Sequence, residues 1–353
     1  MRIAVDGMGG DNAPEEIVKG CVEASRLIDD EIYILGLEDV IKKELKKYKF
    51  DYNKIKIVNA TEVITNDDSP VKAARTKKDS SMIKGLSLVK EGTCDLLISA
   101  GNTGALMAGS LFRFGRIKGI ERPAIGMTYP VIGRGVSLLV DAGANSECRP
   151  SNLHEFAVMG SIYMNKVLGI EEPSVGLINI GAEEKKGTPM LKEAYQLLKN
   201  SELNFCGNVE AREIPFGAAD VLVCDGFVGN TILKLSEGLA DKIVHVLKDM
   251  FTSSVRAKMG AVMMADQLKG LKKIFDYSEY GGAPILGVRG PVIKIHGSSN
   301  AKAVTNAIIK GVPYVEQDVV GIISRAVAEL SENEAEKSAG DAPDASEDRK
   351  EAE

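Results

Sequence analysis

Residues 96–104 read LLISAGNTG, an apolar run that ends in a small, glycine-rich turn. Such runs are typical of buried parallel strands in an open α/β sheet, where ligands bind beyond the carboxyl ends of the strands. Glycine could simply terminate each strand, but repetition with polar side chains in the turns favours a composite site along one edge of the sheet. Five further segments repeat the pattern: IAVDGMGGD (3–11), LLVDAGAN (138–145), VGLINIGAEE (175–184), VLVCDGFVGN (221–230) and VIKIHGSSN (292–300).

The segments between these runs have the composition of helices. We expect helices from near Pro14, over 38–47 and over 69–91, a helix from 102 or 103 to about 114, and a long one over about 229–250. Strands that alternate with helices predict a mostly parallel sheet covered on both faces, which is a three-layer α/β/α sandwich.

Composition and charge limit the possible partners. The chain has 353 residues, 44% of them hydrophobic, with no Trp and only 5% aromatic residues. The net charge of −6 comes from residues 331–353, which hold nine acidic and three basic side chains, so the first 330 residues are neutral. A neutral body with few aromatic rings argues against nucleic-acid binding.

Two segments depart from the alternating pattern. Residues 251–275 predict an amphipathic helical insertion, which is either an ordinary core-facing helix or an element that contacts a membrane surface or a partner. Residues 331–353 are acidic and have no apolar face, which predicts a disordered tail. We therefore expect one α/β domain over 1–330, with two lobes around a cleft as an alternative arrangement.

Familiar cofactor and metal motifs are absent from the sequence. Residues 7–12 (GMGGDN) do not fit GxGxxG, and no Walker A loop, HExxH or GxSxG motif occurs. The five cysteines form no CxxC pair, so neither a zinc site nor a disulfide framework is expected. No cofactor or metal is predicted. The chain opens directly with a strand, MRIAVDG, so we expect a cytoplasmic protein.

Only one of the three histidines has a position that suggests a ligand-facing role. His154 and His245 lie within predicted helices, where surface or packing roles are the simpler interpretation. His296 ends a predicted strand directly before GSSN, at the edge where we expect the site.

Eight ordered motifs together resemble one known family. The chain is similar over residues 1 to about 330 to the phosphate acyltransferases of bacterial phospholipid synthesis. The motifs are DGMGGDNAP (6–14), RTKKDSSM (75–82), SAGNTGAL (99–106), GIERPA (119–124), DAGAN (141–145), IGAEEKKG (180–187), CDGFVGN (224–230) and YGGAPILGVRGPVIKIHGSSN (280–300).

The resemblance implies an activity, a fold and a set of partners. The implied reaction turns acyl-[acyl carrier protein] and inorganic phosphate into acyl phosphate and free carrier protein. The implied fold is that of phosphate acetyltransferases and of isocitrate and isopropylmalate dehydrogenases, in a homodimer. The family also implies peripheral association with the inner face of the cell membrane, with 251–275 as the matching contact region. There the acyl phosphate would pass to a membrane glycerol-3-phosphate acyltransferase.

The implied chemistry assigns roles to particular residues. A thioester is already activated, so the enzyme has to hold phosphate beside the carbonyl and stabilise the oxyanion. The candidate catalytic residues are Lys186, Asn230 and His296, and His296 could stabilise the oxyanion, bind phosphate or protonate the leaving thiolate. The candidate substrate-binding residues are Asp6, Arg75, Ser81, Asn102, Thr103, Asn145, Lys185, Asp225 and Ser298.

Some of these residues have a plainer interpretation. Asp6, Asp141 and Asp225 could pin loops as structural acceptors, and Lys185 with Lys186 could be solvated charge. Lys186 matches the family pattern, whereas Lys185 does not. Because the carrier protein is acidic, we expect a basic docking face, drawn from Lys72, Arg75, Lys77 and Lys78 or from the lysines of 269–273.

Three other functions remain open from the sequence alone. The chain could act on short acyl-CoA as a phosphate acetyltransferase does. It could also be an NAD-dependent β-decarboxylating dehydrogenase relative with a different cofactor loop. Finally, it could be a non-catalytic lipid-binding protein that uses 251–275.

Overall fold

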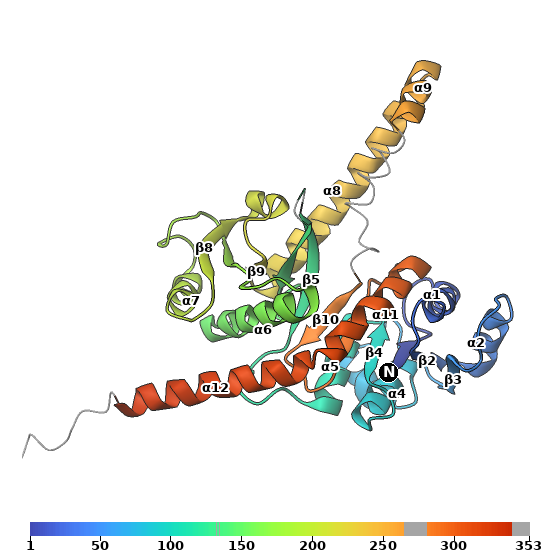
Figure 1. Cartoon of the computed structure of the whole chain (residues 1–353), viewed down its shortest axis with the longest axis horizontal. Helices are drawn as coiled ribbons and strands as arrows, with labels where there is room; N and C mark the ends of the chain where they lie inside the picture. Colours follow the sequence, from blue (N-terminus) through green and yellow to red (C-terminus); the bar gives the residue numbers. More distant parts are fainter. Residues whose placement is uncertain (132, 134, 265–280, 341–353) are drawn as a thin grey trace, which may run out of the picture.

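The computed structural model describes residues 1–131, 133, 135–264 and 281–340. In this part of the chain, strands form one sheet in the order β3-β2-β1-β4-β11-β10-β5-β6-β9-β7-β8 (Figure 1). The strands are β1 (Arg2–Asp6), β2 (Glu31–Gly36), β3 (Ile55–Asn59), β4 (Leu96–Ser99), β5 (Ala124–Val131), β6 (Gly135–Val140), β7 (Val175–Asn179), β8 (Phe205–Glu210), β9 (Val221–Val223), β10 (Ala283–Leu286) and β11 (Val292–Lys294).

Helices connect most of these strands. They are α1 (Glu15–Ser25), α2 (Glu38–Leu45), α3 (Pro70–Thr76), α4 (Ser81–Lys90), α5 (Thr103–Phe114), α6 (Pro150–Leu168), α7 (Pro189–Lys199), the 3₁₀ helix η1 (Ala211–Phe216), α8 (Gly226–Thr252), α9 (Val255–Met263), α11 (Ala301–Glu316) and α12 (Val319–Gly340).

Helices cover both faces of the sheet. On one face α1, α6, α7 and α11 pack around Phe156, Tyr163 and Tyr314, and on the other α4 and α5 pack around Met82 and Leu86. Each fully buried side chain of this size stabilises the fold by about 1.5–3 kcal/mol relative to an exposed one. The predicted three-layer α/β/α architecture is confirmed.

The two halves of the sheet run in opposite directions. Strands β1, β2, β3, β4 and β11 are parallel to one another, and so are β6, β7, β8 and β9. Between the halves, β10 is antiparallel to β11 and β5, and β5 is antiparallel to β6. The carboxyl ends of β1, β4 and β11 therefore lie at one edge of the sheet, and those of β6, β7 and β9 at the other. The expectation of one shared edge for all six loops is wrong.

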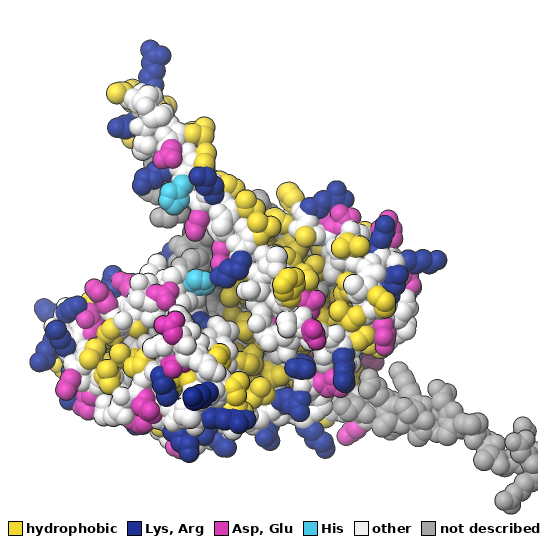
Figure 2. All heavy atoms as spheres, turned by 180° about the vertical axis from the view of Figure 1, so that it is seen from behind, with side chains coloured by type: hydrophobic (Ala, Val, Ile, Leu, Met, Phe, Trp, Pro, Cys, Tyr) yellow, Lys and Arg dark blue, Asp and Glu magenta, His cyan; other side chains and the backbone are white. Residues whose placement is uncertain are grey.

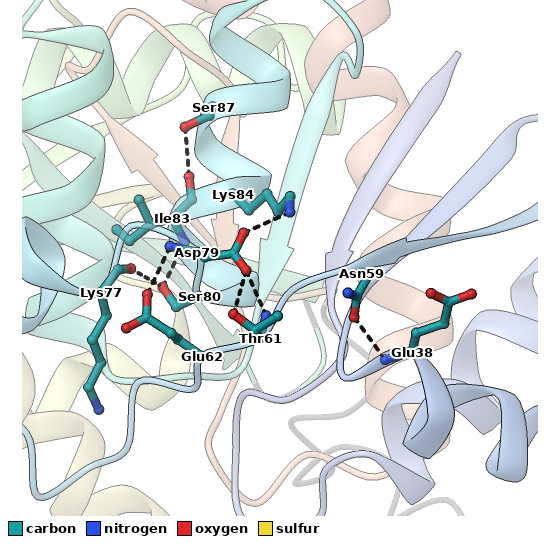
Figure 3. Close-up of polar contacts among 10 residues, drawn as sticks. All are labelled: Glu38, Asn59, Thr61, Glu62, Lys77, Asp79, Ser80, Ile83, Lys84 and Ser87. Atoms are coloured by element: carbon teal, nitrogen blue, oxygen red, sulfur yellow. Dashed lines mark hydrogen bonds and ion pairs between the residues drawn. The ribbon is translucent and has the colours of Figure 1, made fainter.

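The single helix predicted over 69–91 is also wrong, because a polar loop divides it into α3 and α4. The Asp79 carboxylate accepts the backbone N–H and the hydroxyl of Thr61 at 2.9 and 2.6 Å and pairs with the Lys84 ammonium at 2.7 Å (Figure 3). These bonds, led by the one from Lys84, hold the pKa of Asp79 well below its usual range. Ser80 then starts α4, since its hydroxyl accepts the N–H of Ile83.

Three helices extend from the body of the molecule. Helix α8 and the following α9 project together, and α12 extends in another direction (Figure 1). The predicted insertion over 251–275 falls on the end of α8 and on α9, and its residues 265–275 lie outside the described part. Helix α12 runs to Gly340, so the backbone is helical ten residues into the segment expected to be disordered. Among the described residues, no helix combines the length and apolarity that crossing a bilayer requires.

Candidate active site

The loops that follow β1, β4 and β11 contact one another at one edge of the sheet. The Asp11 N–H donates to the Gly297 carbonyl at 2.7 Å. Gly10 has φ +96°, and a Cβ there would lie 2.8 Å from both the Ala100 Cβ and the Gly297 carbonyl oxygen. Only glycine allows this approach of the three loops. Three of the six loops that were predicted to form one composite site thus meet at this edge.

The Asp6 side chain forms hydrogen bonds with residues at the bases of these loops. Its buried carboxylate accepts the Ser99 hydroxyl at 2.7 Å and the Met8 N–H at 3.3 Å, and Ser81 also donates to it. Burial raises the pKa of Asp6. Asp6 and Ser81, predicted to bind substrate, therefore lie beneath the loops and bond to each other, which fits the structural alternative considered for Asp6.

Asn102 and Thr103 form the start of α5. The Asn102 side chain accepts the Ala105 N–H at 2.9 Å and donates to the Thr65 carbonyl at 3.4 Å. The predicted cap is confirmed, and capping occupies this amide. Thr103 is exposed in the first turn of the helix.

Lys294 is a buried cation that the sequence analysis missed. Its side chain lies at the end of β11, and its ammonium donates to the carbonyls of Ala100, at 3.3 Å, and of Ile295. Burial lowers the pKa of Lys294 to about 8, and the carboxylates of Asp6 and Asp11 oppose that shift. An ammonium has three donors, so one N–H remains for a ligand.

His296 is held by Ser298, two residues further along the chain. The Ser298 N–H donates to His296 Nδ1 at 3.2 Å, and the Ser298 hydroxyl lies 2.7 Å from the same atom. The Lys234 ammonium lies 3.4 Å from Nε2, so both ring nitrogens of His296 face a hydrogen-bond donor. Burial lowers the pKa of His296, and the Glu237 carboxylate, 4.0 Å from Nε2, opposes the shift only in part. The lowered pKa favours the neutral ring near pH 7.

Lys294, His296 and Ser298 line a cavity of about 580 Å³. This volume lies within the usual range for ligand pockets, roughly 300–1,000 Å³. Its other walls come from β5, η1, α8 and residues 281 and 282, and they are mostly apolar: Met127, Tyr129, Pro130, Pro215, Ile232, Leu233, Leu235, Leu239, Ala240 and Ile243. Figure 2 shows hydrophobic side chains gathered on α8 and on the adjoining body.

Two hydroxyls beside this cavity are buried. Thr128 Oγ1 and Ser299 Oγ both belong to cavity-lining residues, and neither has a hydrogen-bond partner within the described part of the chain. An unpaired buried hydroxyl costs about 1–3 kcal/mol.

The loops after β6 and β9 form a second group, organised by Asp141. Its carboxylate accepts the N–H groups of Ile125 at 2.9 Å and Asn145 at 2.7 Å, as well as the Asn145 amide at 3.0 Å. Asn145 also donates to the Pro123 carbonyl at 2.7 Å. Asp225 caps α8 through the Val228 N–H at 2.8 Å. Asn145 and Asp225, predicted to bind substrate, are thus engaged in holding this loop group and α8.

Three predicted basic residues lie away from the cavity. The Arg75 guanidinium lies 4.9 Å from the centre of the exposed Phe112 ring, between α3 and α5. Lys185 and Lys186 are exposed in the loop after β7, and Lys186 lies 4.0 Å from Glu183. The described cavity lining contains none of the three.

Helix α8 links the two groups of loops. Its first turns lie against the Asp141 loop, where Asn230 contacts Gly143. One turn later, the Lys234 ammonium lies 3.4 Å from His296 Nε2 and 2.8 Å from Glu237. Residues 230, 234 and 237 share one helix face by their spacing. Asn230 therefore lies on the face of α8 that leads to His296, although it does not line the cavity.

Comparison with known sequences identifies clear relatives. The family described as fatty acid synthesis protein matches residues 1–321. A phosphate acyltransferase of Clostridioides difficile (strain 630) is 51% identical over 94% of this chain and 98% of the relative. A phosphate acyltransferase of Clostridium acetobutylicum is 55% identical over 94% of this chain and 100% of the relative.

Solved structures share the fold at low sequence identity. A phosphotransacetylase from Streptococcus pyogenes has a TM-score of 0.63 and 18% identity, covering 90% of this chain and 94% of that one. A 4-hydroxythreonine-4-phosphate dehydrogenase from Klebsiella pneumoniae has a TM-score of 0.51 and 10% identity, covering 92% and 98%. At these identities the likeness concerns the fold alone, and the predicted kinship with phosphate acetyltransferases is confirmed at that level.

Proposed function

Because the chain belongs to the family of fatty acid synthesis proteins whose relatives are phosphate acyltransferases, we propose that its substrates are a long-chain acyl-[acyl carrier protein] and inorganic phosphate. The product would be acyl phosphate, an early intermediate of phospholipid synthesis. One observation carries this proposal. The same cavity is lined by a buried ammonium and an imidazole and, along α8, by apolar side chains.

Inorganic phosphate would bind in the cavity beside Lys294. The third N–H of the Lys294 ammonium would donate to it, and so would the Ser299 hydroxyl, which has no hydrogen-bond partner among the described residues. Charge-assisted hydrogen bonds of this kind are about twice as strong as neutral ones. They would hold phosphate beside the thioester, so that the reaction depends on positioning rather than on a strong base.

His296 would stabilise the oxyanion. A phosphate oxygen attacks the carbonyl carbon, negative charge develops on the carbonyl oxygen, and the C–S bond then breaks to release the carrier thiolate. In the tautomer with its proton on Nε2, neutral His296 would donate to that oxygen while the Ser298 N–H donates to Nδ1. Burial lowers the pKa of His296 and so disfavours the imidazolium that would protonate the leaving thiolate, which favours the oxyanion role among the three considered. Catalytic roles for Lys186 and Asn230 remain predictions.

The acyl chain would lie along the apolar wall that α8 supplies. Replacing Ala240 with phenylalanine adds bulk to this wall, so activity on a sixteen-carbon acyl thioester should fall at least about tenfold more than activity on a four-carbon one. The comparison is made by kcat/KM for the two chain lengths. Val246, further along α8 and outside the cavity lining, provides the control, because Val246→Phe should leave the ratio unchanged. Equal losses on both chain lengths would place the acyl chain elsewhere.

Binding of the carrier protein, the membrane and a second copy is part of the same proposal. Exposed Lys72, Arg75 and Lys78 supply a basic face for the acidic carrier protein. On α9, Val255, Met259, Val262 and Met263 are exposed and suit contact with the inner face of the membrane, where a glycerol-3-phosphate acyltransferase would accept the product. The homodimer stays a prediction, because the apolar side chains of α8 that line the cavity are assigned to the acyl chain.

The experiment that tests this function is a trapping assay. Purified protein is mixed with hexadecanoyl carrier protein and inorganic phosphate, and acyl phosphate is captured with hydroxylamine. We expect hydroxamate in proportion to enzyme and phosphate. Hydroxamate from short acyl-CoA but not from the carrier thioester would support the phosphate acetyltransferase alternative. No hydroxamate from either, above the enzyme-free control, would contradict the proposal.

A further inference from the structure

A second hollow, with a different lining, lies where the loop before β5 meets the start of α6. Its volume is about 660 Å³. It shares no lining residue with the cavity that contains Lys294 and His296, which is called the acyl cavity from here on. The lining is almost entirely polar or charged: Arg116, Glu121, Arg122, Glu147, Cys148, Arg149 and Asn152. Three arginines against two glutamates leave it with net positive charge. Glu121 and Arg122 come from the GIERPA stretch, to which the proposed function assigns no role.

Internal contacts fix one side of this hollow. The Glu121 carboxylate accepts the Asn152 amide at 3.0 Å, and the Glu121 N–H donates to Glu155 at 3.0 Å. Arg116 donates to the Glu121 carbonyl. The Glu121 carboxylate is therefore already engaged by Asn152, and the Glu155 carboxylate holds the loop that carries Arg122 against α6.

Two of the arginines keep their donors available. Arg149 is 79% exposed and approaches Glu121 only at 4.0 Å, which is too long for a hydrogen bond. The Arg122 guanidinium makes no hydrogen bond or ion pair with the described part of the chain, and it lies close enough to Cys148 to lower that thiol's pKa against the larger effect of burial. Arg149 is also the N-cap of the nineteen-residue α6, so the positive end of this helix faces the hollow.

Planar guanidinium groups with several free N–H donors match the oxygens of a phosphoryl group, because they can bond two of them at once. We propose that this hollow is a second anion site, separate from the acyl cavity, that binds a phosphoryl dianion through Arg122 and Arg149. The ligand is either free inorganic phosphate or the phosphate of a monoester.

Binding can be tested without catalysis. Isothermal titration with inorganic phosphate, and separately with phenyl phosphate, is carried out on the wild type, on Arg122→Gln with Arg149→Gln, and on Lys294→Met. Arg325→Gln, an exposed arginine on α12, is the matched control. We expect two phosphate-binding events in the wild type. The double arginine variant should weaken one of them about tenfold or more, and the Lys294 variant should remove the other.

The outcomes separate the site, its ligand and the proposed function. Tighter binding of phenyl phosphate at the arginine-dependent site identifies a monoester ligand, and tighter binding of inorganic phosphate identifies the free ion. Phosphate and phenyl phosphate affinities that are unchanged in a folded double arginine variant would overturn the proposal. So would a single binding event that is lost with Lys294. The hydroxamate assay of the same variants tests the acyltransferase reaction independently.

Discussion

Replacing Lys294 with methionine should lower kcat/KM for acyl phosphate formation by about 10²–10³-fold. Methionine has a similar length but no charge, so the variant removes the cation that would hold phosphate in the acyl cavity. The loss should appear mainly as a higher KM for inorganic phosphate. Steady-state kinetics at varied phosphate, with hydroxylamine trapping of the product, measures it.

The control for this variant is Lys192→Met, which makes the same change at an exposed position on α7. It should retain wild-type activity. Circular dichroism establishes that Lys294→Met is folded. A folded Lys294 variant with wild-type kcat/KM would remove this residue from the reaction.

Lys294 also predicts how activity and stability change with pH. Its pKa in the folded protein is about 8, against an ordinary value of 10.5. If the ammonium is required, kcat/KM should fall as pH rises through about 8. Between about 8 and 10.5 the unfolded chain binds more protons at this residue than the folded one, so this residue's contribution to stability should rise with pH over the same window. Both effects should be absent in Lys294→Met, which comparison of its pH profiles with the wild type tests.

Replacing Gly229 with alanine should destabilise the protein by about 3 kcal/mol or more. Alanine normally stabilises a helix by about 0.8–1.0 kcal/mol relative to glycine. At this position on α8, however, an added Cβ would lie 2.0 Å from the Asp141 backbone carbonyl oxygen and 3.1 Å from Cys224 Sγ. Backbone atoms cannot move aside as a flexible side chain can, so α8 would have to shift from the Asp141 loop. Urea unfolding gives the free energy.

Gly238 provides the matched control on the same helix, because nothing lies within 4 Å of an added Cβ there. Gly238→Ala should therefore stabilise the protein by about 0.5–1 kcal/mol. Opposite signs for the two glycines would support the close contact between α8 and the Asp141 loop. Stabilisation by both would show that α8 does not approach the loop as described.

The sequence predicted the layers of the fold better than the directions of its strands. Apolar runs that end in glycine-rich turns identified β1, β4, β6, β7, β9 and β11, because a buried strand must be apolar along its whole length. Strands β5 and β10 each contain a proline, at Pro130 and Pro284, and were not predicted. Since these two strands reverse the direction of the sheet, the sequence pattern could not show that the six loops form two groups.

The candidate site was predicted in part. His296 and Ser298 were identified because a polar turn follows β11 directly, and both line the cavity. Lys294 was missed because it lies within the apolar run 292–295. That run predicts a buried strand, and site residues were expected only in the turn that follows it. The signal was available, since a lysine inside a buried strand is costly unless it is paired or functional. Asn102, Asn145 and Asp225 were predicted to bind substrate, but they cap helices or hold loops. Turn and cap positions favour the same residue types as binding sites, so the sequence alone does not separate the two roles.

The central claim is that the acyl cavity holds phosphate beside the acyl carbonyl. The most direct test is a crystal structure with a long-chain acyl phosphonate, a stable analogue of the acyl phosphate product. We predict the phosphonate oxygens within hydrogen-bond distance of Lys294 Nζ and Ser299 Oγ, the acyl carbonyl oxygen within reach of His296 Nε2, and the chain along α8. A phosphonate bound away from Lys294 and His296, with the cavity empty, would contradict the account.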